Sequence, residues 1–474
     1  MALFQRKSET VSRSERMATE PIPKLIPAMA LPAIIAFLIN SIYSLADTFF
    51  VSSLGTNATA AVSVNSSLDM IIMMTGSLFA VGAASYIARL LGAGKKDRAS
   101  DVLSTSWFSV FFIGIILMAI CVPNIHPLVR MLGATESCET YAVQYATYVL
   151  LVAPFMGTSF VMNQCLRSEG AAMRSMIGMS FGGILNCVLD PIFIFKLDLG
   201  VAGASMATAI SKVVSFVILI YPYIAKKSEL HLTIRRYRFD KIIFKEVLSV
   251  GASSLFRSGL MVVSGIILNR IAGGISDSVL AGIGVCQKLM MFPFGVILGI
   301  GTGFTPVAGF NFGACKFDRV RESFRFASIV SVIVAIGMAL VIGIPAHGLI
   351  HLFSAADGEM MRIGALAIRT QCITMPIHAW VAMVNMYSSG LGDAKGAFVL
   401  ATARQGTCFL PIVFPMTILW GAIGVGTVQA VADGLTILLA LPVLSKLRKK
   451  VNAAEQAFIE EKAERAAAEA AAAP

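Results

Sequence analysis

Long apolar stretches recur along the whole chain, and they constrain its fold more than any other feature. Each has 18 residues or more, which is enough to cross a bilayer as a helix. We count twelve of them, near residues 24–52, 58–88, 102–122, 143–166, 175–195, 201–224, 243–271, 279–311, 324–350, 362–388, 396–418 and 421–446. The sequence therefore predicts an all-α polytopic membrane protein.

Composition agrees with this prediction. Of the 474 residues, 57% are hydrophobic and 14% are charged, with a mean hydropathy of +0.79. A soluble domain usually carries about 25% charged residues. The first stretch is too long for a cleavable signal peptide, and no small-residue cleavage site follows it. The eight cysteines show no paired metal-binding spacing, so we interpret them as small hydrophobic residues.

Basic residues are distributed unevenly between the connecting segments, which predicts the orientation. With a cytoplasmic N-terminus, 30 of the 38 Lys and Arg residues lie on the cytoplasmic side and five on the opposite side. This asymmetry is typical of the positive-inside rule. It predicts a multi-pass membrane protein with both termini in the cytoplasm. The net charge of +11 then reflects topology, and no nucleic-acid partner is expected. The cytoplasmic segments are the N-terminal arm, 89–100, 167–175, 226–246, 313–325, 390–404 and the C-terminal tail.

An internal repeat organises the chain. The segment GAGKKDR at 92–98 recurs as GACKFDR at 313–319, an offset of 221 residues. Other residues match at nearly the same offset, and the preserved register predicts a six-plus-six duplication. Because both copies fall on the cytoplasmic side, the repeat is parallel, with its axis along the membrane normal. The further matches are Pro154 with Pro376, Asn163 with Asn385, Gly170 with Gly392, Gly200 with Gly421 and Gly203 with Gly424.

The repeat predicts five regions: an N-terminal arm, an N-lobe, a basic linker, a C-lobe and a tail. We expect the linker to be cytoplasmic and to contact anionic lipid headgroups through its charge. The alanine-rich tail is typical of an exposed helix, whether or not its last residues belong to the natural chain. The predicted ranges are 1–23, 24–225, 226–242, 243–446 and 447–474 respectively.

Polar side chains inside the N-lobe spans mark a candidate site. Asn186 and Asp190 are four residues apart, so they share a helix face, and Pro191 removes a helical hydrogen bond and favours a bend. Asn40 and Asp47 lie two turns apart on the first span. An intramembrane charge costs about 2.5–3.5 kcal/mol on insertion scales, so such residues usually face a cavity or an ion path. Thr208 and Asn163 add a hydroxyl and an amide; for these two and Asn40, helix packing is an equally good interpretation.

Four segments resemble the MATE family of multidrug and toxic compound extrusion transporters, in its DinF and MepA-type branch. They are LADTFFVSSLG at 45–55, GGILNCVLDPIF at 182–193, MMFPFGVILGIGTGFTPVAGFNFGACKFDRV at 290–320 and SSGLGDAKGA at 388–397. The resemblance spans about residues 20–448. It implies a V-shaped bundle of two six-helix lobes that exports small molecules by H⁺ or Na⁺ antiport, with no cofactor. It also implies an N-lobe cation site at Asp47, Asn186, Asp190 and Thr208, with Asn40 and Asn163 as polar cavity positions nearby.

The C-lobe differs from that pattern. Arg257 lies where some family members carry an acid, so a second acidic cation site is not expected there. The polar candidates for the substrate cavity are Lys288, His378 and Asp433. Lys288 and Asp433 are expected to form an ion pair between helices; the alternative is that Asp433 is a second protonatable or substrate-contacting acid. His378 is either a packed hydrogen-bonding residue or a group that titrates during transport.

These observations favour export of amphipathic, cationic small molecules by alternating access, with membrane lipid as surroundings and a monomer as the functional unit. Lys212 on the sixth span is expected to be the counter-ion of an N-lobe acid. Apart from Na⁺ at the N-lobe site, no metal is expected. One alternative is a flippase for lipid-linked or oligosaccharide substrates, which would use Arg257, Lys288 and Lys212 for an anionic head. An intramembrane enzyme is a remote alternative, because the sequence lacks the paired metal-binding motif H-E-x-x-H.

Overall fold

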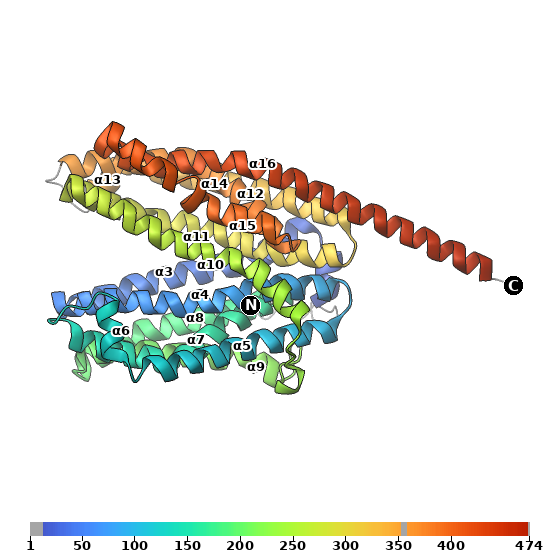
Figure 1. Cartoon of the computed structure of the whole chain (residues 1–474), viewed down its shortest axis with the longest axis horizontal. Coiled ribbons are helices and arrows are strands. Elements are labelled where there is room, and N and C mark those ends of the chain that lie inside the picture. Colours follow the sequence, from blue (N-terminus) through green and yellow to red (C-terminus); the bar gives the residue numbers. More distant parts are fainter. Residues whose placement is uncertain (1–12, 352–357, 473–474) are drawn as a thin grey trace.

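The computed structural model describes residues 13–351 and 358–472, and within these ranges it is helical with no strand. Two groups of helices lie side by side along one long axis (Figure 1). We call them the N-lobe and the C-lobe. The N-lobe contains α3 (Ile22–Ser52), α4 (Thr56–Gly92), α5 (Lys96–Cys121), α6 (Ile125–Met131), α7 (Glu139–Ser168), α8 (Ala172–Pro191), the π-helix η1 (Ile192–Lys196) and α9 (Gly200–Ile224). A short helix, α2 (Arg13–Thr19), precedes it.

The C-lobe follows the linker in the same order. It contains α10 (Lys241–Ile275), α11 (Asp277–Gly313), α12 (Phe317–Gly343), α13 (Ala346–His351), α14 (Gly358–Gly390), α15 (Ala394–Thr402), the π-helix η3 (Ala403–Thr407) and α16 (Leu410–Ala472). Gly421 interrupts α16 with a φ of 53°, so two spans meet there. The predicted span 324–350 ends earlier, because α12 stops at Gly343 and α13 begins a separate short helix.

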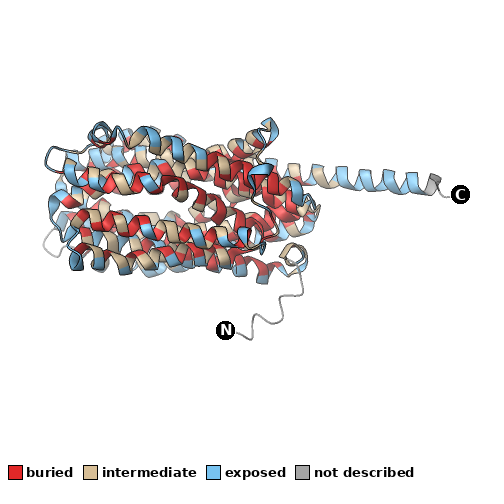
Figure 2. Cartoon of the chain, turned by 90° about the horizontal axis from the view of Figure 1, so that it is seen from below, coloured by how far each residue is buried: buried red, intermediate tan, exposed pale blue. Residues whose placement is uncertain are grey.

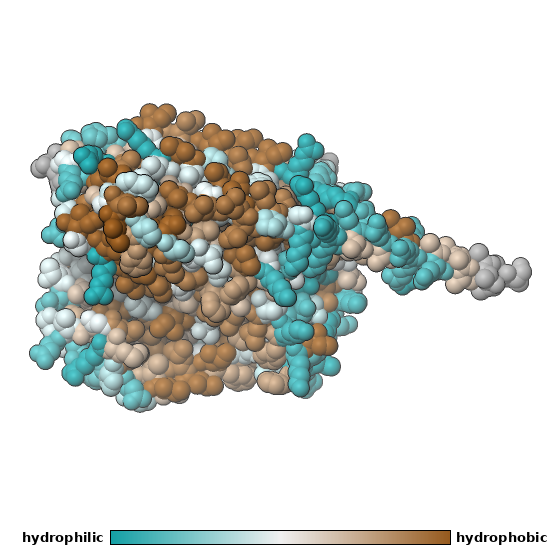
Figure 3. All heavy atoms as spheres, turned by 45° about the horizontal axis from the view of Figure 1, so that its top comes forward, coloured by the Kyte–Doolittle hydropathy of each residue, from teal (hydrophilic) through white to brown (hydrophobic). Residues whose placement is uncertain are grey.

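Ten helical segments in the described part of the chain are long and apolar enough to cross a membrane. One of them, residues 394–469, contains the last two predicted spans, and α14 covers the predicted tenth span. Large apolar side chains are exposed on the outer faces of the bundle, for example Val341 at 73% and Ile418 at 81%. Figure 3 shows an apolar belt with hydrophilic residues toward the two ends. The predicted all-α polytopic membrane fold is confirmed.

The lobes pack most closely at the end that carries the basic loops, and glycines allow this approach. A Cβ atom on Gly92 of α4 would lie 1.9 Å from the carbonyl oxygen of Phe310 on α11, and one on Gly313 would lie 2.0 Å from that of Arg89. Gly92 and Gly313 are equivalent positions of the repeat, so the two contacts are related by its pseudo-twofold symmetry. From this end the two groups of helices diverge (Figure 1).

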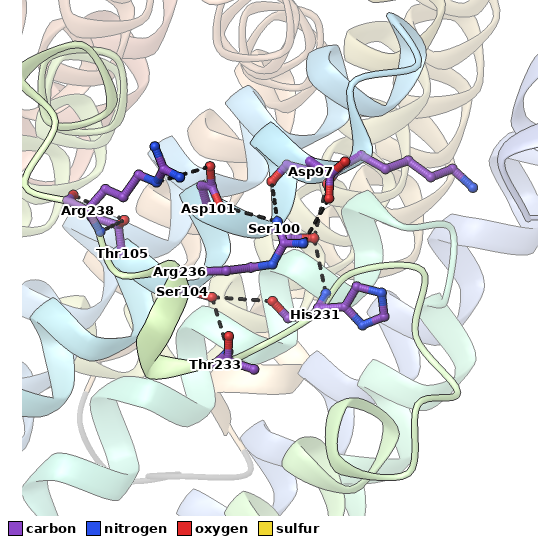
Figure 4. Close-up of polar contacts among 10 residues, drawn as sticks. Asp97, Ser100, Asp101, Ser104, Thr105, His231, Thr233, Arg236 and Arg238 are labelled. Carbon is purple, nitrogen blue, oxygen red and sulfur yellow. Dashed lines mark hydrogen bonds and ion pairs between the residues drawn. The ribbon is translucent and has the colours of Figure 1, made fainter.

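The segment between the lobes is fastened to α5 of the N-lobe (Figure 4). Two polar residues one turn apart on α5 bind its backbone: Ser100 Oγ accepts from the His231 amide at 3.1 Å, and Ser104 Oγ accepts from the Thr233 amide at 3.3 Å. Arg236 of the 3-10 helix η2 (Ile234–Arg236) pairs with Asp97 at 2.8 Å. The linker is therefore attached to the N-lobe, and part of its positive charge is paired with an acid of α5.

A buried carboxyl group closes the same end of the N-lobe. Glu169, directly after α7, accepts hydrogen bonds from Tyr223 Oη at 3.1 Å, from Ser228 Oγ and from the backbone amide of Glu229 at 3.1 Å. Burial raises the pKa of Glu169 to about 7, although the three donors and nearby Arg13 favour its charged form. Glu169 thus joins α7, α9 and the start of the linker at a pH-sensitive point.

The end of α16 leaves the bundle. After Lys450 the helix continues with mostly exposed residues, as Figures 1 and 2 show. Buried residues lie between the helices of both lobes, whereas this extension is exposed over most of its length (Figure 2). The tail is therefore helical up to Ala472, and its side chains are mostly exposed up to Glu469.

Candidate functional site

The N-lobe contains a cavity between α3, α4, α7, α8 and α9. Four of the residues predicted from sequence line it: Asn40, Asn163, Asn186 and Thr208. They lie on four different helices, α3, α7, α8 and α9. The cavity therefore forms only when these helices pack together. The other lining residues are Tyr43, Met73, Met156, Ser159, Phe160, Met179, Gly182, Gly183, Ser211, Lys212, Ser215 and Leu219.

A buried polar cluster lies at this cavity. The Asn186 amide nitrogen is 3.2 Å from Asp190 Oδ1 and 3.1 Å from Thr208 Oγ1, so one side-chain amide joins α8 to α9. All three side chains are buried, and Asp190 has no exposed surface. Asp190 Oδ2 and Asn186 Oδ1 have no hydrogen-bond donor. Unpaired buried oxygens are costly, so this cluster is suited to accept a proton or a hard cation.

The helix around Asp190 is irregular. α8 ends at Pro191 and continues as the π-helix η1, in which the Leu197 amide bonds to the carbonyl oxygen of Ile192. Proline lacks the amide hydrogen that a regular helix needs at this point, and single π-turns occur often at functional sites. The bend expected from Pro191 is therefore realised as a change from α- to π-helix directly after the carboxylate.

Asp47 lies close enough to Asp190 for the two charges to interact, and Asp47 Oδ1 has no hydrogen-bond donor. Lys212 of α9 is within electrostatic range of Asp47 and Asp69, and its ammonium lies 5.3 Å from the centre of the Tyr43 ring. Lys212 is therefore placed to act as the counter-ion of both Asp47 and Asp69. The charged group that acts on Asp190 is Asp47, another carboxylate.

Two of these neighbours, Asp69 and Tyr43, are not among the site residues predicted from sequence. Asp69 Oδ1 has no hydrogen-bond donor either, and it shares Lys212 with Asp47. Tyr43 lies three residues after Asn40 and four before Asp47, so the helical spacing on α3 could have identified it. Asn163 is held differently from the cluster, since its amide donates to the carbonyl oxygen of Ser175 at 3.1 Å.

The predicted ion pair of Lys288 with Asp433 is wrong. Asp433, which is 1% exposed, binds Arg404 instead, with Nε–Oδ1 and Nη2–Oδ2 distances of 2.7 and 3.2 Å. Gln429 donates to the same Oδ1 at 3.0 Å. Arg404 was expected in a cytoplasmic loop, but it lies in η3, ten residues into the eleventh span. The planar guanidinium binds both carboxylate oxygens, a geometry that an ammonium cannot reproduce.

The same arginine extends the cluster toward the other C-lobe candidate. Its Cζ lies 4.3 Å from the centre of the Phe294 ring, and the Phe294 ring contacts the His378 ring edge to face at 5.0 Å. Lys288 is exposed and lies two turns before Gly295, which faces Phe37 of the N-lobe, so Lys288 is on the face of α11 directed at the N-lobe. Arg257 donates to Ser254 Oγ at 3.3 Å.

The comparisons with known proteins agree with this architecture. A family model described as MatE matches residues 32–192 and 254–414, one match in each lobe. The chain belongs to the MATE family. It is accordingly a membrane transporter and not an enzyme.

Similar proteins cover nearly the whole chain. Multidrug export protein MepA of Staphylococcus aureus is 28% identical over 446 residues, which is 93% of this chain and 97% of that protein. The protein of the same name from Staphylococcus haemolyticus is 27% identical over 439 residues, covering 92% and 96%.

Two solved structures show how closely the MATE fold is matched. An outward-facing multidrug resistance MATE transporter superposes with a TM-score of 0.87 at 25% identity, covering 94% of this chain and all of that one. A second structure is a transporter of the MOP superfamily from Pyrococcus furiosus, with a TM-score of 0.85 at 25% identity and coverages of 94% and 100%. Its authors describe a binding pocket of reversed polarity and suggest a different function.

Proposed function

We propose that this MATE-family transporter exports amphipathic, cationic small molecules in exchange for H⁺ or Na⁺, with Asp190 as the residue that takes up the incoming ion. The observation that carries the proposal is the state of the Asp190 carboxylate. It is fully buried, one of its oxygens has no donor, and the charged group that acts on it is another carboxylate, Asp47. A carboxylate in such surroundings is stabilised by a proton or a cation.

The cluster supports a division of roles among the acids. Lys212 compensates Asp47 and Asp69, whereas Asp190 has Asn186 and Thr208 as neutral neighbours. The incoming ion therefore binds at Asp190, with the free oxygens of Asn186 and Asp47 as further ligands. Asn40 and Asn163 line the adjoining cavity, where a substrate cation is attracted by the unneutralised carboxylate behind Asn186 and Thr208.

Exchange then follows from competition between two cations for one carboxylate. With the site empty, the negative charge of Asp190 favours a cationic substrate in the cavity. When H⁺ or Na⁺ binds from outside, that attraction is lost and the substrate leaves. The coupling is reciprocal, so bound substrate weakens ion binding by the same factor. The N-lobe, residues 24–225 with the attached linker, and the C-lobe, residues 243–446, move as two bodies about the contacts at Gly92 and Gly313.

Multidrug export by the relatives named MepA supports the substrate class, and the basic loops support a bacterial cytoplasmic membrane with both termini inside. Both GA-x-K-x-D-R loops, the linker and the start of the tail lie at one end of the bundle. α2 connects them there: Asn311 and Lys316 donate to backbone carbonyls of Met17 and Ala18, and Ser14 binds Glu229.

Ethidium movement in proteoliposomes tests the proposal, with a pH gradient and a Na⁺ gradient applied separately. We expect transport under one gradient and its loss in Asp190→Asn. The matched control is Asp198→Asn, which removes the same charge from an exposed position just after η1. Asparagine tolerates the positive φ of 51° that Asp198 adopts, so the control adds no backbone strain. Equal transport by the unmodified protein and Asp190→Asn would contradict the proposal.

One observation favours the flippase alternative. The exposed Lys288 is directed at the N-lobe, so the C-lobe presents a positive charge to it. Movement of a fluorescent anionic lipid, abolished by Lys288→Gln and unaffected by Asp190→Asn, would establish that alternative in place of cation export.

A further inference from the structure

A groove runs along the outer face of the C-lobe, between α12, α14 and α16. α14 forms its floor, because α12 and α16 each pack mainly on α14 and barely touch one another. One end of the groove, which we call its mouth, lies beside the basic loops and the start of the tail. The lining residues are Arg321, Phe324, Arg325, Ser328, Ile329, Val332, Ile333, Trp380, Tyr387, Arg448, Val451 and Asn452.

The part of the groove farther from the basic loops is apolar. Ile329 and Ile333 of α12 are 49% and 62% exposed on one wall, and Trp380 of α14 lies on the floor. Closer to the basic loops, the rings of Phe324 and Tyr387 stack with their centres 4.6 Å apart. Arg325 and Ile333 are eight residues apart, or about 12 Å at 1.5 Å per residue. That length is close to the depth of one leaflet of the hydrocarbon core, about 15 Å.

The mouth of the groove is positively charged. Arg321 is already engaged, since it binds Asp318, Asn452 and Glu455. Arg325 and Arg448 are exposed, and neither has an acidic partner within the described part of the chain. They come from α12 and α16, so they approach the mouth from its two walls. Two arginines without carboxylates above an apolar channel match a phosphate that is attached to an acyl chain.

We propose that this groove binds an anionic phospholipid of the leaflet next to the basic loops. Arg325 and Arg448 bind the headgroup phosphate, and one acyl chain lies along Ile329, Ile333 and Trp380. A zwitterionic lipid would bring its own cation close to these arginines and gain less. A free phosphate would contact the mouth alone and leave the apolar floor uncovered. The site lies on the outer face of the C-lobe, on helices that do not line the N-lobe cavity, and does not depend on the transported substrate.

Trp380 makes the proposal measurable, because the chain has three tryptophans and the other two can be removed. A variant with Trp107→Phe and Trp420→Phe keeps Trp380 as the fluorophore. It is reconstituted into phosphatidylcholine vesicles containing a minor fraction of phosphatidylglycerol, and one lipid at a time carries brominated acyl chains. At equal mole fraction of the brominated lipid, we expect phosphatidylglycerol to quench Trp380 more strongly than phosphatidylcholine.

Charge-removing variants connect the preference to the mouth. Each arginine near a membrane surface contributes about a fivefold factor in affinity for an anionic lipid. Arg325→Gln with Arg448→Gln should therefore abolish the preference. Arg235→Gln is the matched control, since Arg235 is exposed on the linker of the N-lobe. A second control keeps Trp420, which is 58% exposed, in place of Trp380 and should show equal quenching by both lipids.

Several outcomes would overturn the proposal. Equal quenching of Trp380 by the two lipids would show that no anionic lipid is selected. A preference that survives the double arginine variant would place the selectivity elsewhere. Quenching of Trp380 by neither lipid would mean that protein, such as a second copy of the chain, covers the groove. Loss of the preference on adding inorganic phosphate would assign the mouth to a free anion.

Discussion

The ion pair of Arg404 with Asp433 gives a quantitative prediction, because it is bidentate and buried inside a span. Asp433 is 1% exposed and the Arg404 side chain is 20% exposed, so water screens their charges poorly. Removing one partner of such a pair leaves an uncompensated buried charge, which costs about 3–5 kcal/mol. Arg404→Met and Asp433→Leu should each lower the free energy of unfolding by about that amount. The double variant should come within about 1 kcal/mol of the unmodified protein, since buried pairs often exchange for apolar residues at little cost.

Equilibrium unfolding in mixed detergent micelles measures the three variants as a double-mutant cycle. Lys446→Met is the control for a peripheral pair. Lys446 lies 3.4 Å from Asp393 and its side chain is 60% exposed, so its removal should cost about 0–1 kcal/mol. If the two single variants at Arg404 and Asp433 are as mild as this control, or if the double variant loses the sum of both, the pair is not a coupled buried contact and the argument fails.

Two further predictions concern the basic end of the bundle. The pKa of Glu169 is raised from 4.5 to about 7. Between these pH values the folded protein keeps a proton that the unfolded chain has released. The free energy of unfolding therefore falls as pH rises through this window, by about 3 kcal/mol at most. Thermal unfolding at a series of pH values should show this decline, and Glu169→Gln should remove it; parallel curves for the two proteins would refute the assignment. Gly92→Ala places a Cβ atom against the Phe310 carbonyl and should separate the lobes at this end, whereas Gly284→Ala, which meets nothing within 4 Å, should not. Spin labels at Lys95 and Asp318 report the separation, and an unchanged distance in Gly92→Ala would contradict the close-packing argument.

Much of the architecture could be predicted, because a bilayer leaves few options for long apolar segments. The spans near 201–224 and 279–311 agree with α9 and α11 to within two residues. The duplication could also be predicted, because the repeated GA-x-K-x-D-R motif begins with a glycine that packs closely against the opposite lobe. Hydropathy also places the boundary between the last two spans next to the kink at Gly421. What it could not show is the break after Gly343, where the chain stays apolar while the helix ends.

The candidate site could be predicted where its residues share one helix. Asn186 and Asp190 are one turn apart, and the structure adds Thr208 to them, as the family resemblance implied. The partner of Asp433 could not be predicted in this way. Arg404 lies in the segment ATARQGTC, whose polar residues and glycine resemble a loop, but the chain forms a π-helix there and carries the arginine into the membrane. Contacts between helices far apart in sequence leave no periodic signal, so the proximity of Asp69 on α4 to Lys212 on α9 required coordinates as well.

The role of Asp190 as the residue where ion and substrate compete is the central claim, and binding measured without transport tests it most directly. Ethidium affinity of the purified protein is determined over a range of pH and, separately, of Na⁺ concentration, for the unmodified protein and for Asp190→Asn. The account predicts that one ion weakens ethidium binding to the unmodified protein and has no effect on the variant, because both cations require the same carboxylate. An ion dependence that is identical in the two proteins would contradict it.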